Sequence, residues 1–165
     1  MKILPRLAVV AGTAFVPVAA ASAADVTAGT IVIEHPWTRA TPPGARVAGG
    51  YLVLENLGSD SDRLTGLSSP AADRVEIHEM AMDGGVMTMR PVEDGLDLPP
   101  GQGVALEPGG LHLMLIDLKS GLTEGQSVPV TLTFAKGGTA EIELAVQPMG
   151  AKAPTAGHAM QHGSE

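Results

Sequence analysis

The chain of 165 residues contains no cysteine. This absence excludes disulfides, thiol nucleophiles, thiolate zinc sites, iron–sulfur clusters and the cysteine-ligated blue-copper centre. Aromatic residues are also scarce, with one Trp, one Tyr and two Phe. A core must therefore be built from Val, Leu, Ile, Ala and Met, and aromatic platforms on which bases or sugars stack are largely excluded.

Positively charged residues are also few. Ten Lys and Arg stand against 18 Asp and Glu, and the formal net charge is −8. Proteins that bind nucleic acid need clustered Lys and Arg to neutralise phosphates, so we expect no nucleic-acid partner. The chain also lacks the G-x-S-x-G and H-E-x-x-H strings, and its carboxylates are scattered along the chain. We therefore predict that it is not an enzyme.

The first 24 residues read as a targeting segment. Lys2 and Arg6 precede an uncharged apolar run, and Ala21-Ser22-Ala23 forms a small-residue cleavage pattern. We interpret residues 1–23 as a secretory signal peptide. The alternative is an N-terminal membrane anchor, but Pro17 interrupts the apolar run. No later stretch reaches the ~18 continuous apolar residues of a spanning helix, so we predict an exported, periplasmic protein without a membrane span after cleavage.

Residues 24–149 predict one all-β domain. β-branched and Leu-rich segments alternate with turns rich in Gly, Pro, Asp and Asn, and helical periodicity is hard to find. Eight or nine strands at this spacing are typical of an antiparallel Greek-key sandwich or small barrel. Residues 150–165 lack the alternation, so we predict a flexible tail there. The predicted strands are 31–34, 47–55, 63–67, 74–80, 86–91, 104–106, 111–118, 128–134 and 139–146.

Four of the chain's eight methionines fall within ten residues, close to His78. Taken singly, a methionine is most often a gap-filling core residue. Here Gly84-Gly85 predicts a two-residue hairpin turn that pairs the methionines across two strands. Side chains alternate with period two, so the thioethers and the His78 imidazole would share one face if the loop has an even length. The expected pairs are Met80 with Met89 and Met82 with Met87.

A second candidate cluster is Leu111-His112-Leu113-Met114. His112 and Met114 are two residues apart on a predicted strand and therefore share a face. Taken alone, a histidine in so apolar a strand is more often a hydrogen-bonded core residue than a ligand. His78 is likewise followed two residues later by a methionine, so the two His-x-Met pairs could converge on one ion.

The donor types indicate which ion this would be. Thioethers are soft, uncharged ligands that favour Cu(I), whereas Zn²⁺ prefers thiolate, imidazole or carboxylate and Ca²⁺ prefers oxygen. A mixed set of His and Met therefore indicates copper, as Cu(I). Without a thiolate, rapid blue-copper electron transfer is not expected, so a copper carrier is a better interpretation than a redox protein.

The spacing of these residues resembles the H-x10-M-x21-H-x-M signature of the PCu(A)C family of periplasmic copper chaperones. His78 is followed by ten residues and Met89, and then by 22 residues and His112-Leu113-Met114. The second spacer is one residue longer than in the signature, and a loop at residues 99–103 can absorb the difference. The resemblance extends to the segment from His35 to Ala40 and covers most of residues 26–150.

This resemblance implies a cupredoxin-like β-fold that binds one Cu(I). It implies donation of copper during assembly of the copper centres of cytochrome c oxidase, either directly or through a Sco-type copper protein. The family signature does not assign His35, which we interpret as structural, or Met80, Met82 and Met87, which we interpret as neighbours of the site or packing residues. The implied Cu(I) ligands are His78, Met89, His112 and Met114.

The tail contains a further candidate site, formed by His158, Met160 and His162. It resembles the copper-binding C-terminal extensions of some family members, and imidazole suits Cu(II) better than thioether does, so it would prefer Cu(II). The alternative is a solvated tail that merely contains these residues. Two other functions stay open for the whole chain: periplasmic copper storage or detoxification, and a β-sandwich binding module without a metal.

Overall fold

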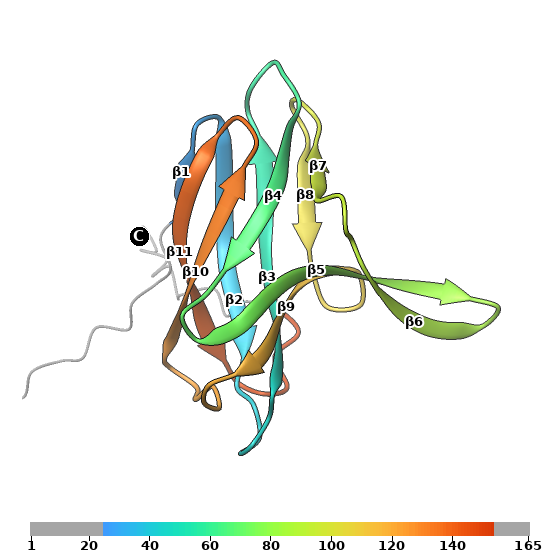
Figure 1. Cartoon of the computed structure of the whole chain (residues 1–165), viewed down its shortest axis with the longest axis vertical. Helices are drawn as coiled ribbons and strands as arrows, with labels where there is room; N and C mark the ends of the chain where they lie inside the picture. The colour runs from blue at the N-terminus through green and yellow to red at the C-terminus, as the bar shows by residue number, and fades with distance from the viewer. Residues whose placement is uncertain (1–24, 154–165) are drawn as a thin grey trace, which may run out of the picture.

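The computed structural model describes residues 25–153, and all of their regular structure is β-strand (Figure 1). The predicted leader and the tail residues His158, Met160 and His162 lie outside the described residues. Between residues 25 and 153 there is no helix long and apolar enough to span a membrane. The strands are β1 (Val26–Ala28), β2 (Ile31–Arg39), β3 (Val47–Asn56), β4 (Asp62–Ser68), β5 (Ala72–Asp83), β6 (Val86–Pro91), β7 (Leu96–Leu98), β8 (Gly103–Leu106), β9 (Leu111–Leu118), β10 (Ser127–Phe134) and β11 (Gly138–Gln147).

The all-β fold predicted from the sequence is confirmed. The strands form one sheet in the order β6-β5-β9-β3-β2-β11-β10-β4-β7, with β1 beside β2 and β8 beside β3. The sheet folds over on itself, so β4 and β5 lie near each other although they are far apart in that order (Figure 1). The pairings are antiparallel except for β11 with β2, a parallel pair that the sequence analysis did not anticipate.

Each of the predicted strands corresponds to a strand of the structure. The two additional strands, β1 and β7, have three residues each, which is too short for an alternating pattern to be visible in the sequence. β2 is longer than predicted because it continues past His35, where a left-handed backbone (φ 49°) accompanies a register shift against β3. β5 runs on to Asp83, beyond the end of its pairing with β9 at Glu79.

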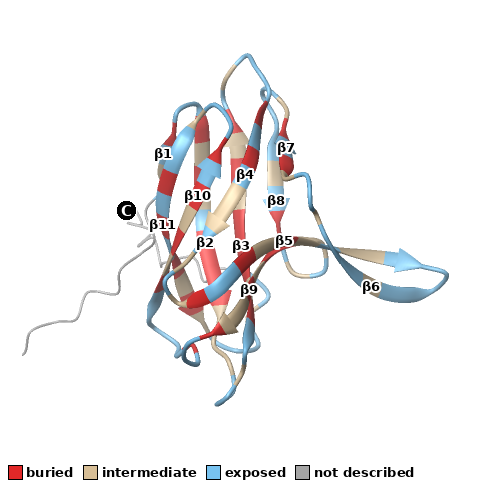
Figure 2. Ribbon diagram, in the orientation of Figure 1, coloured by how far each residue is buried: buried red, intermediate tan, exposed pale blue. Residues whose placement is uncertain are grey.

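The core lies inside the folded sheet and is mainly aliphatic, as the composition predicts (Figure 2). β11 shows the alternation clearly. Ala140, Ile142 and Leu144 are buried, whereas Glu141 and Glu143 between them are exposed. Burial of such side chains stabilises the fold by roughly 25 cal/mol for each Å² of apolar surface removed from water.

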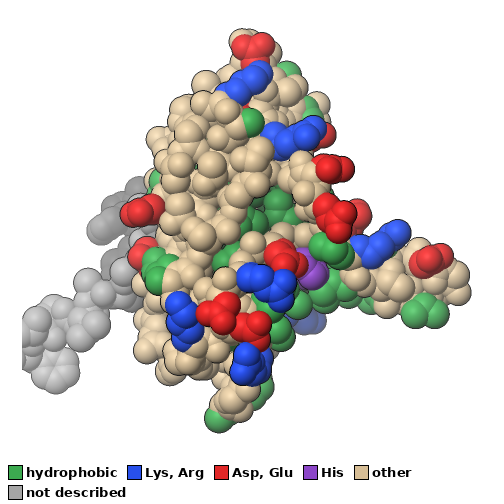
Figure 3. Space-filling model, in the orientation of Figure 1, with side chains coloured by type: hydrophobic (Ala, Val, Ile, Leu, Met, Phe, Trp, Pro, Cys, Tyr) green, Lys and Arg blue, Asp and Glu red, His purple; other side chains and the backbone are tan. Residues whose placement is uncertain are grey.

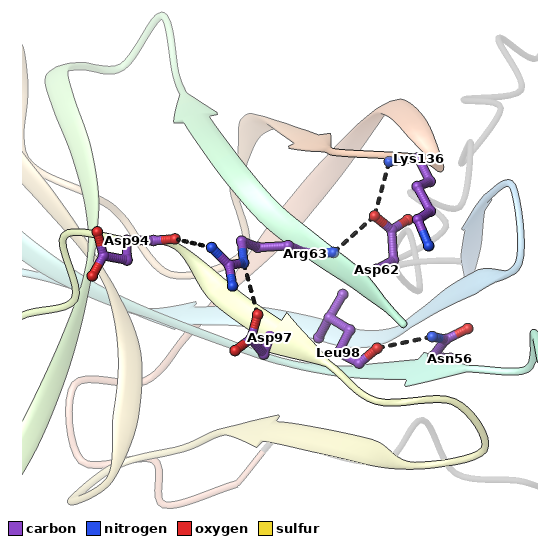
Figure 4. A network of polar contacts seen from close by, with 7 residues as sticks. All are labelled: Asn56, Asp62, Arg63, Asp94, Asp97, Leu98 and Lys136. Carbon is purple, nitrogen blue, oxygen red and sulfur yellow. Dashed lines mark hydrogen bonds and ion pairs between the residues drawn. The ribbon is translucent and has the colours of Figure 1, made fainter. Parts of the chain in front are cut away.

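Asn56 is fully buried at the end of β3. Its amide nitrogen donates to the carbonyl oxygens of Asp60 (2.8 Å) and Leu98 (2.9 Å). Its amide oxygen accepts from the backbone N–H of Gly58 (2.9 Å) and from the hydroxyl of Thr30 (3.2 Å). These bonds offset the cost of burying the amide. They tie β3 to β7 and to the loop that follows β3 (Figure 4).

Asp62, at the start of β4, is buried beside the turn between β10 and β11 (Figure 4). Its carboxylate accepts hydrogen bonds from the backbone N–H groups of Arg63 (2.7 Å), Lys136 (2.8 Å) and Gly137 (2.8 Å). Burial opposes ionisation of this carboxyl group, but the three donors and the charge of Lys136 together outweigh it and hold the pKa of Asp62 below its ordinary value. The ionised carboxylate therefore fastens β4 to that turn.

We predict that Asp62→Asn lowers the free energy of unfolding at pH 7 by about 1–3 kcal/mol, because the new amide nitrogen would face a backbone N–H. The pKa of Asp62 is depressed in the folded state, so its stabilisation is complete above the ordinary carboxyl pKa and is lost as the pH falls through the folded value. Urea unfolding of both proteins from pH 7 down to pH about 2 measures the difference.

The matched control for this variant is Asp60→Asn, which neutralises an exposed carboxylate two residues away. We expect it to change stability by less than about 0.5 kcal/mol. A loss in the control as large as that in Asp62→Asn, or a stability gap that does not shrink at low pH, would contradict the role given to Asp62.

Candidate metal centre

The register of β5 with β9 places the two predicted histidines directly opposite each other. His78 pairs with His112, and their ring centroids lie 6.0 Å apart with the planes tilted by 51°. His112 is only 6% exposed, and the side chain of His78 is 14% exposed. Two imidazoles that are far apart in the sequence therefore stand together in a position largely shielded from water.

Hydrogen bonds determine which ring nitrogen of each histidine is free. Nδ1 of His112 lies 3.0 Å from the carbonyl oxygen of Gly110, and a carbonyl only accepts, so Nδ1 carries the proton and Nε2 keeps its lone pair. Nε2 of His78 lies 3.0 Å from a carboxylate oxygen of Glu76 and donates to it. Nδ1 of His78 is buried without a hydrogen-bond partner. Each ring is thus held through one nitrogen and presents the other, as metal-ligating histidines do.

Glu76 is a functional candidate that the sequence analysis missed. It lies two residues before His78 on β5 and therefore shares its face, and it pairs directly with Met114 of β9. Its carboxylate contacts His78 and also Arg74, at 3.1 Å. The period-two alternation that groups His78 with Met80 could also have identified Glu76.

The hairpin predicted from Gly84-Gly85 is confirmed, including its register. Both glycines have positive φ angles, 56° and 85°, as a two-residue hairpin turn requires. Asp83 pairs with Val86 on either side of the turn. The methionine pairs follow as predicted: Met80 lies opposite Met89, and Met82 lies opposite Met87.

The two methionines of the predicted ligand set flank the histidine pair from opposite directions. Met114 lies opposite Glu76, and Met89 lies opposite Met80, so each is a diagonal neighbour of His78 on the same face. Met114 is partly buried, whereas Met89 is 45% exposed. The four predicted side chains therefore share one surface that runs across β9, β5 and β6, with Met89 at its exposed end.

The remaining candidates differ in how close they lie to the histidine pair. Met80 is partly buried beside His78, but Met82 and Met87 are 70% and 58% exposed, so they do not pack in the core. His35 is exposed on β2, which β3 separates from β9 in the sheet. It therefore lies outside the surface that carries the two paired histidines.

The donor atoms of this surface are unusual for a metal site. Among residues 25–153, no three His, Asp or Glu side chains gather in an arrangement that could hold a metal ion. The surface instead offers two imidazoles, several thioethers and one carboxylate. Hard ions prefer oxygen ligands, so this mixture suits a soft ion.

The chain matches a family model and a relative that are both described as putative lipoproteins. Residues 31–146 match the family model described as "Putative lipoprotein LpqE-like". "Putative lipoprotein Lxx21020" of Leifsonia xyli subsp. xyli is 33% identical over 117 residues, which cover 71% of this chain and 69% of that protein. An uncharacterized protein of Rickettsia prowazekii is 31% identical over 106 residues, which cover 61% of this chain and 57% of that protein.

The similar solved structures include PCuAC domains and a protein whose structure is described as its CuI form. The copper-bound PCuAC domain from PmoF2 is 32% identical, with a TM-score of 0.65 over 76% of this chain and 98% of that domain. The CuI form of DR1885 from Deinococcus radiodurans is 29% identical, with a TM-score of 0.57 over 78% of this chain and 83% of that protein. The cupredoxin-like fold implied by the sequence resemblance is thereby confirmed. The chain belongs to the LpqE-like family, which is the PCuAC family.

Proposed function

We propose that this protein is a Cu(I) chaperone, which binds one Cu(I) ion and releases it to another protein. The observation that carries the proposal is the pairing of His78 with His112 on one face of β5 and β9, with thioethers on either side. Two similar structures support it, because one is described as copper-bound and the other as a CuI form.

The donor atoms on this face suit Cu(I). We propose that Nδ1 of His78 and Nε2 of His112 are the nitrogen ligands and that Met89 and Met114 supply the sulfur ligands. A buried ring nitrogen without a partner, such as Nδ1 of His78, is costly in the metal-free protein, and a bound ion would satisfy it. All four donors are neutral and two are soft, which favours Cu(I) over Zn²⁺.

A carrier must also release its ion. Met89 is exposed and His112 is buried, so the ligands of an acceptor protein can displace the Met89 thioether first. Thioethers hold Cu(I) without the negative charge that thiolates would add, which keeps each displacement reversible. Release by stepwise ligand exchange requires no change in the oxidation state of copper.

Removal of ligands tests this assignment. We predict that the double variant His112→Ala, Met114→Leu lowers Cu(I) affinity by a larger factor than about 10–100-fold. That factor is the usual cost of losing a group that only orients a metal ligand, whereas this variant removes two proposed ligands. Met82→Leu should leave the affinity unchanged. Competition with a chromogenic Cu(I) chelator measures the affinity, and X-ray absorption counts the sulfur and nitrogen neighbours of copper. Wild-type affinity in the double variant would overturn the ligand assignment.

Glu76 provides a second test. We predict that Glu76→Ala lowers Cu(I) affinity about 10–100-fold, because the His78 ring loses the group that orients it. Glu76→Gln should restore most of the affinity, since its amide oxygen can still accept from Nε2–H of His78. The matched control is Glu79→Ala, which removes an exposed carboxylate from the opposite face of β5.

Nitrogen-15 NMR of the His78 ring gives an independent measurement on the metal-free Glu76 variants. The tautomer with the proton on Nε2 should dominate in the wild type and in Glu76→Gln, and the other tautomer should gain population in Glu76→Ala. Unchanged affinity together with an unchanged tautomer in Glu76→Ala would show that the carboxylate does not position His78.

We further propose that the protein is exported to the periplasm and delivers copper for assembly of cytochrome c oxidase, directly or through a Sco-type copper protein. The leader pattern in residues 1–23 supports export, and so does the description of a relative as a lipoprotein. The oxidase as destination rests on the sequence resemblance. The tail residues His158, Met160 and His162 remain a proposed second site, with a preference for Cu(II).

A deletion strain grown across a series of copper concentrations tests the delivery. We predict that loss of the protein lowers the copper content and activity of the oxidase when copper is scarce, and that added copper largely restores both. The physical reason is mass action, since a carrier matters most when its ion is limiting. Normal oxidase activity at the lowest copper, combined with hypersensitivity to high copper, would instead support storage or detoxification.

A further inference from the structure

The strands β5 and β6 continue beyond the sheet as a two-stranded projection (Figure 1), which we name the arm and define as residues 80–89. Its apolar side chains are unusually exposed, at 70% for Met82, 63% for Val86, 58% for Met87 and 45% for Met89. They are four of the seven large hydrophobic residues that are exposed in the described part of the chain. A concentration of this kind marks an interaction site.

The thioethers of the arm form one continuous row. Residues directly opposite each other in an antiparallel pair project to the same face, so two successive methionine pairs share the face of His78. The pairs follow each other at intervals of about 7 Å along the strands. Figure 3 shows hydrophobic side chains along one side of the arm and a histidine where the arm joins the body. The opposite face of the arm carries Ala81, Asp83, Val86 and Thr88.

We propose that the outer pair of this row, Met82 and Met87, is a second, weaker Cu(I) site, through which the ion passes to and from the histidine pair. The inference rests on the proposed Cu(I) chaperone function and extends it to residues that the ligand set does not include. Two to four neutral sulfur donors suit Cu(I) and no harder ion. Without an imidazole, the outer pair Met82 and Met87 should bind more weakly than the histidine site and exchange faster.

The transfer is a sequence of ligand exchanges. Cu–S bonds to Met80 and Met89 form as the two Cu–S bonds of the outer pair break. A Cu–N bond to Nδ1 of His78 then forms as the bond to Met80 breaks, and the bond to Met89 is kept. Copper remains Cu(I), so no electron is gained or lost. No proton has to leave the His78 ring when copper binds. The ring proton is on Nε2, which donates it to Glu76, and Nδ1 has a free lone pair.

An apolar docking surface would explain the exposure of the arm equally well. It would not explain why the exposed apolar residues are mostly methionine rather than leucine. Leucine retains the apolar volume of methionine and usually costs less than about 1.5 kcal/mol when exchanged for it. The double variant Met82→Leu, Met87→Leu therefore keeps a docking surface and removes the sulfur. The matched control is Met149→Leu, which changes a methionine that is 56% exposed outside the arm.

The experiment is a Cu(I) titration of the full chain without oxygen, followed by NMR of carbon-13 methionine methyl groups and of the histidine rings. The first equivalent should shift the signals of His78 and His112, and excess Cu(I) should then shift those of Met82 and Met87. Stopped-flow removal of Cu(I) by a chelator should be about tenfold slower in the arm double variant, with the affinity for the first equivalent unchanged, and normal in Met149→Leu.

The outcomes separate this inference from the proposed function. If the first equivalent of Cu(I) does not shift the histidine signals, the proposed chaperone site is overturned, whether or not the methionine signals of the arm shift. Histidine signals that respond, with Met82 and Met87 signals that never shift, would overturn the arm site alone. So would a chelator rate in the arm double variant equal to that of the wild type, which is the result expected for a surface that only docks a partner.

Discussion

The antiparallel register between β5 and β9 is the constraint on which the candidate site depends. On the face that points into the core, Val75 lies opposite Leu115 and Ile77 lies opposite Leu113, and all four are buried. A slip by one residue would turn these side chains toward water and the polar face toward the core. The hydrophobic face thus fixes the register, and the same register places His78 opposite His112 on the other face.

The sequence was sufficient to predict local geometry. Gly84-Gly85 determines both the turn and the register of the strands it joins, because each residue of the hairpin is paired by its distance from the turn. No such rule relates β5 to β9, which are separated in the chain by β6, β7 and β8. The sequence therefore could not predict that His78 lies opposite His112. It could predict only that the histidine and the methionine of each His-x-Met pair lie on the same face of their strand.

Other features escaped the sequence analysis for separate physical reasons. The strands β1 and β7 are too short to show a period, and the parallel pairing of β2 with β11 joins the two ends of the domain, where no turn specifies direction. Glu76 was missed because charged residues on strands usually belong to a solvated face. Its function becomes visible only through its hydrogen bond to His78, which a pattern of residue types does not contain.

The two halves of the candidate site differ in how they are supported. His112 lies on β9, an inner strand between β3 and β5. It pairs with His78 of β5, and the residues that follow it, Leu113 to Ile116, also pair with β3 and hold the strand in place. Met89 lies on β6, the last strand of the sheet, in a two-stranded segment of a kind that is only marginally stable alone in water. Local opening costs least in such a segment. The rigid nitrogen donors can bind an ion selectively, and the readily displaced sulfur donor allows the ion to be released. A site built entirely within the sheet would release its ion less readily.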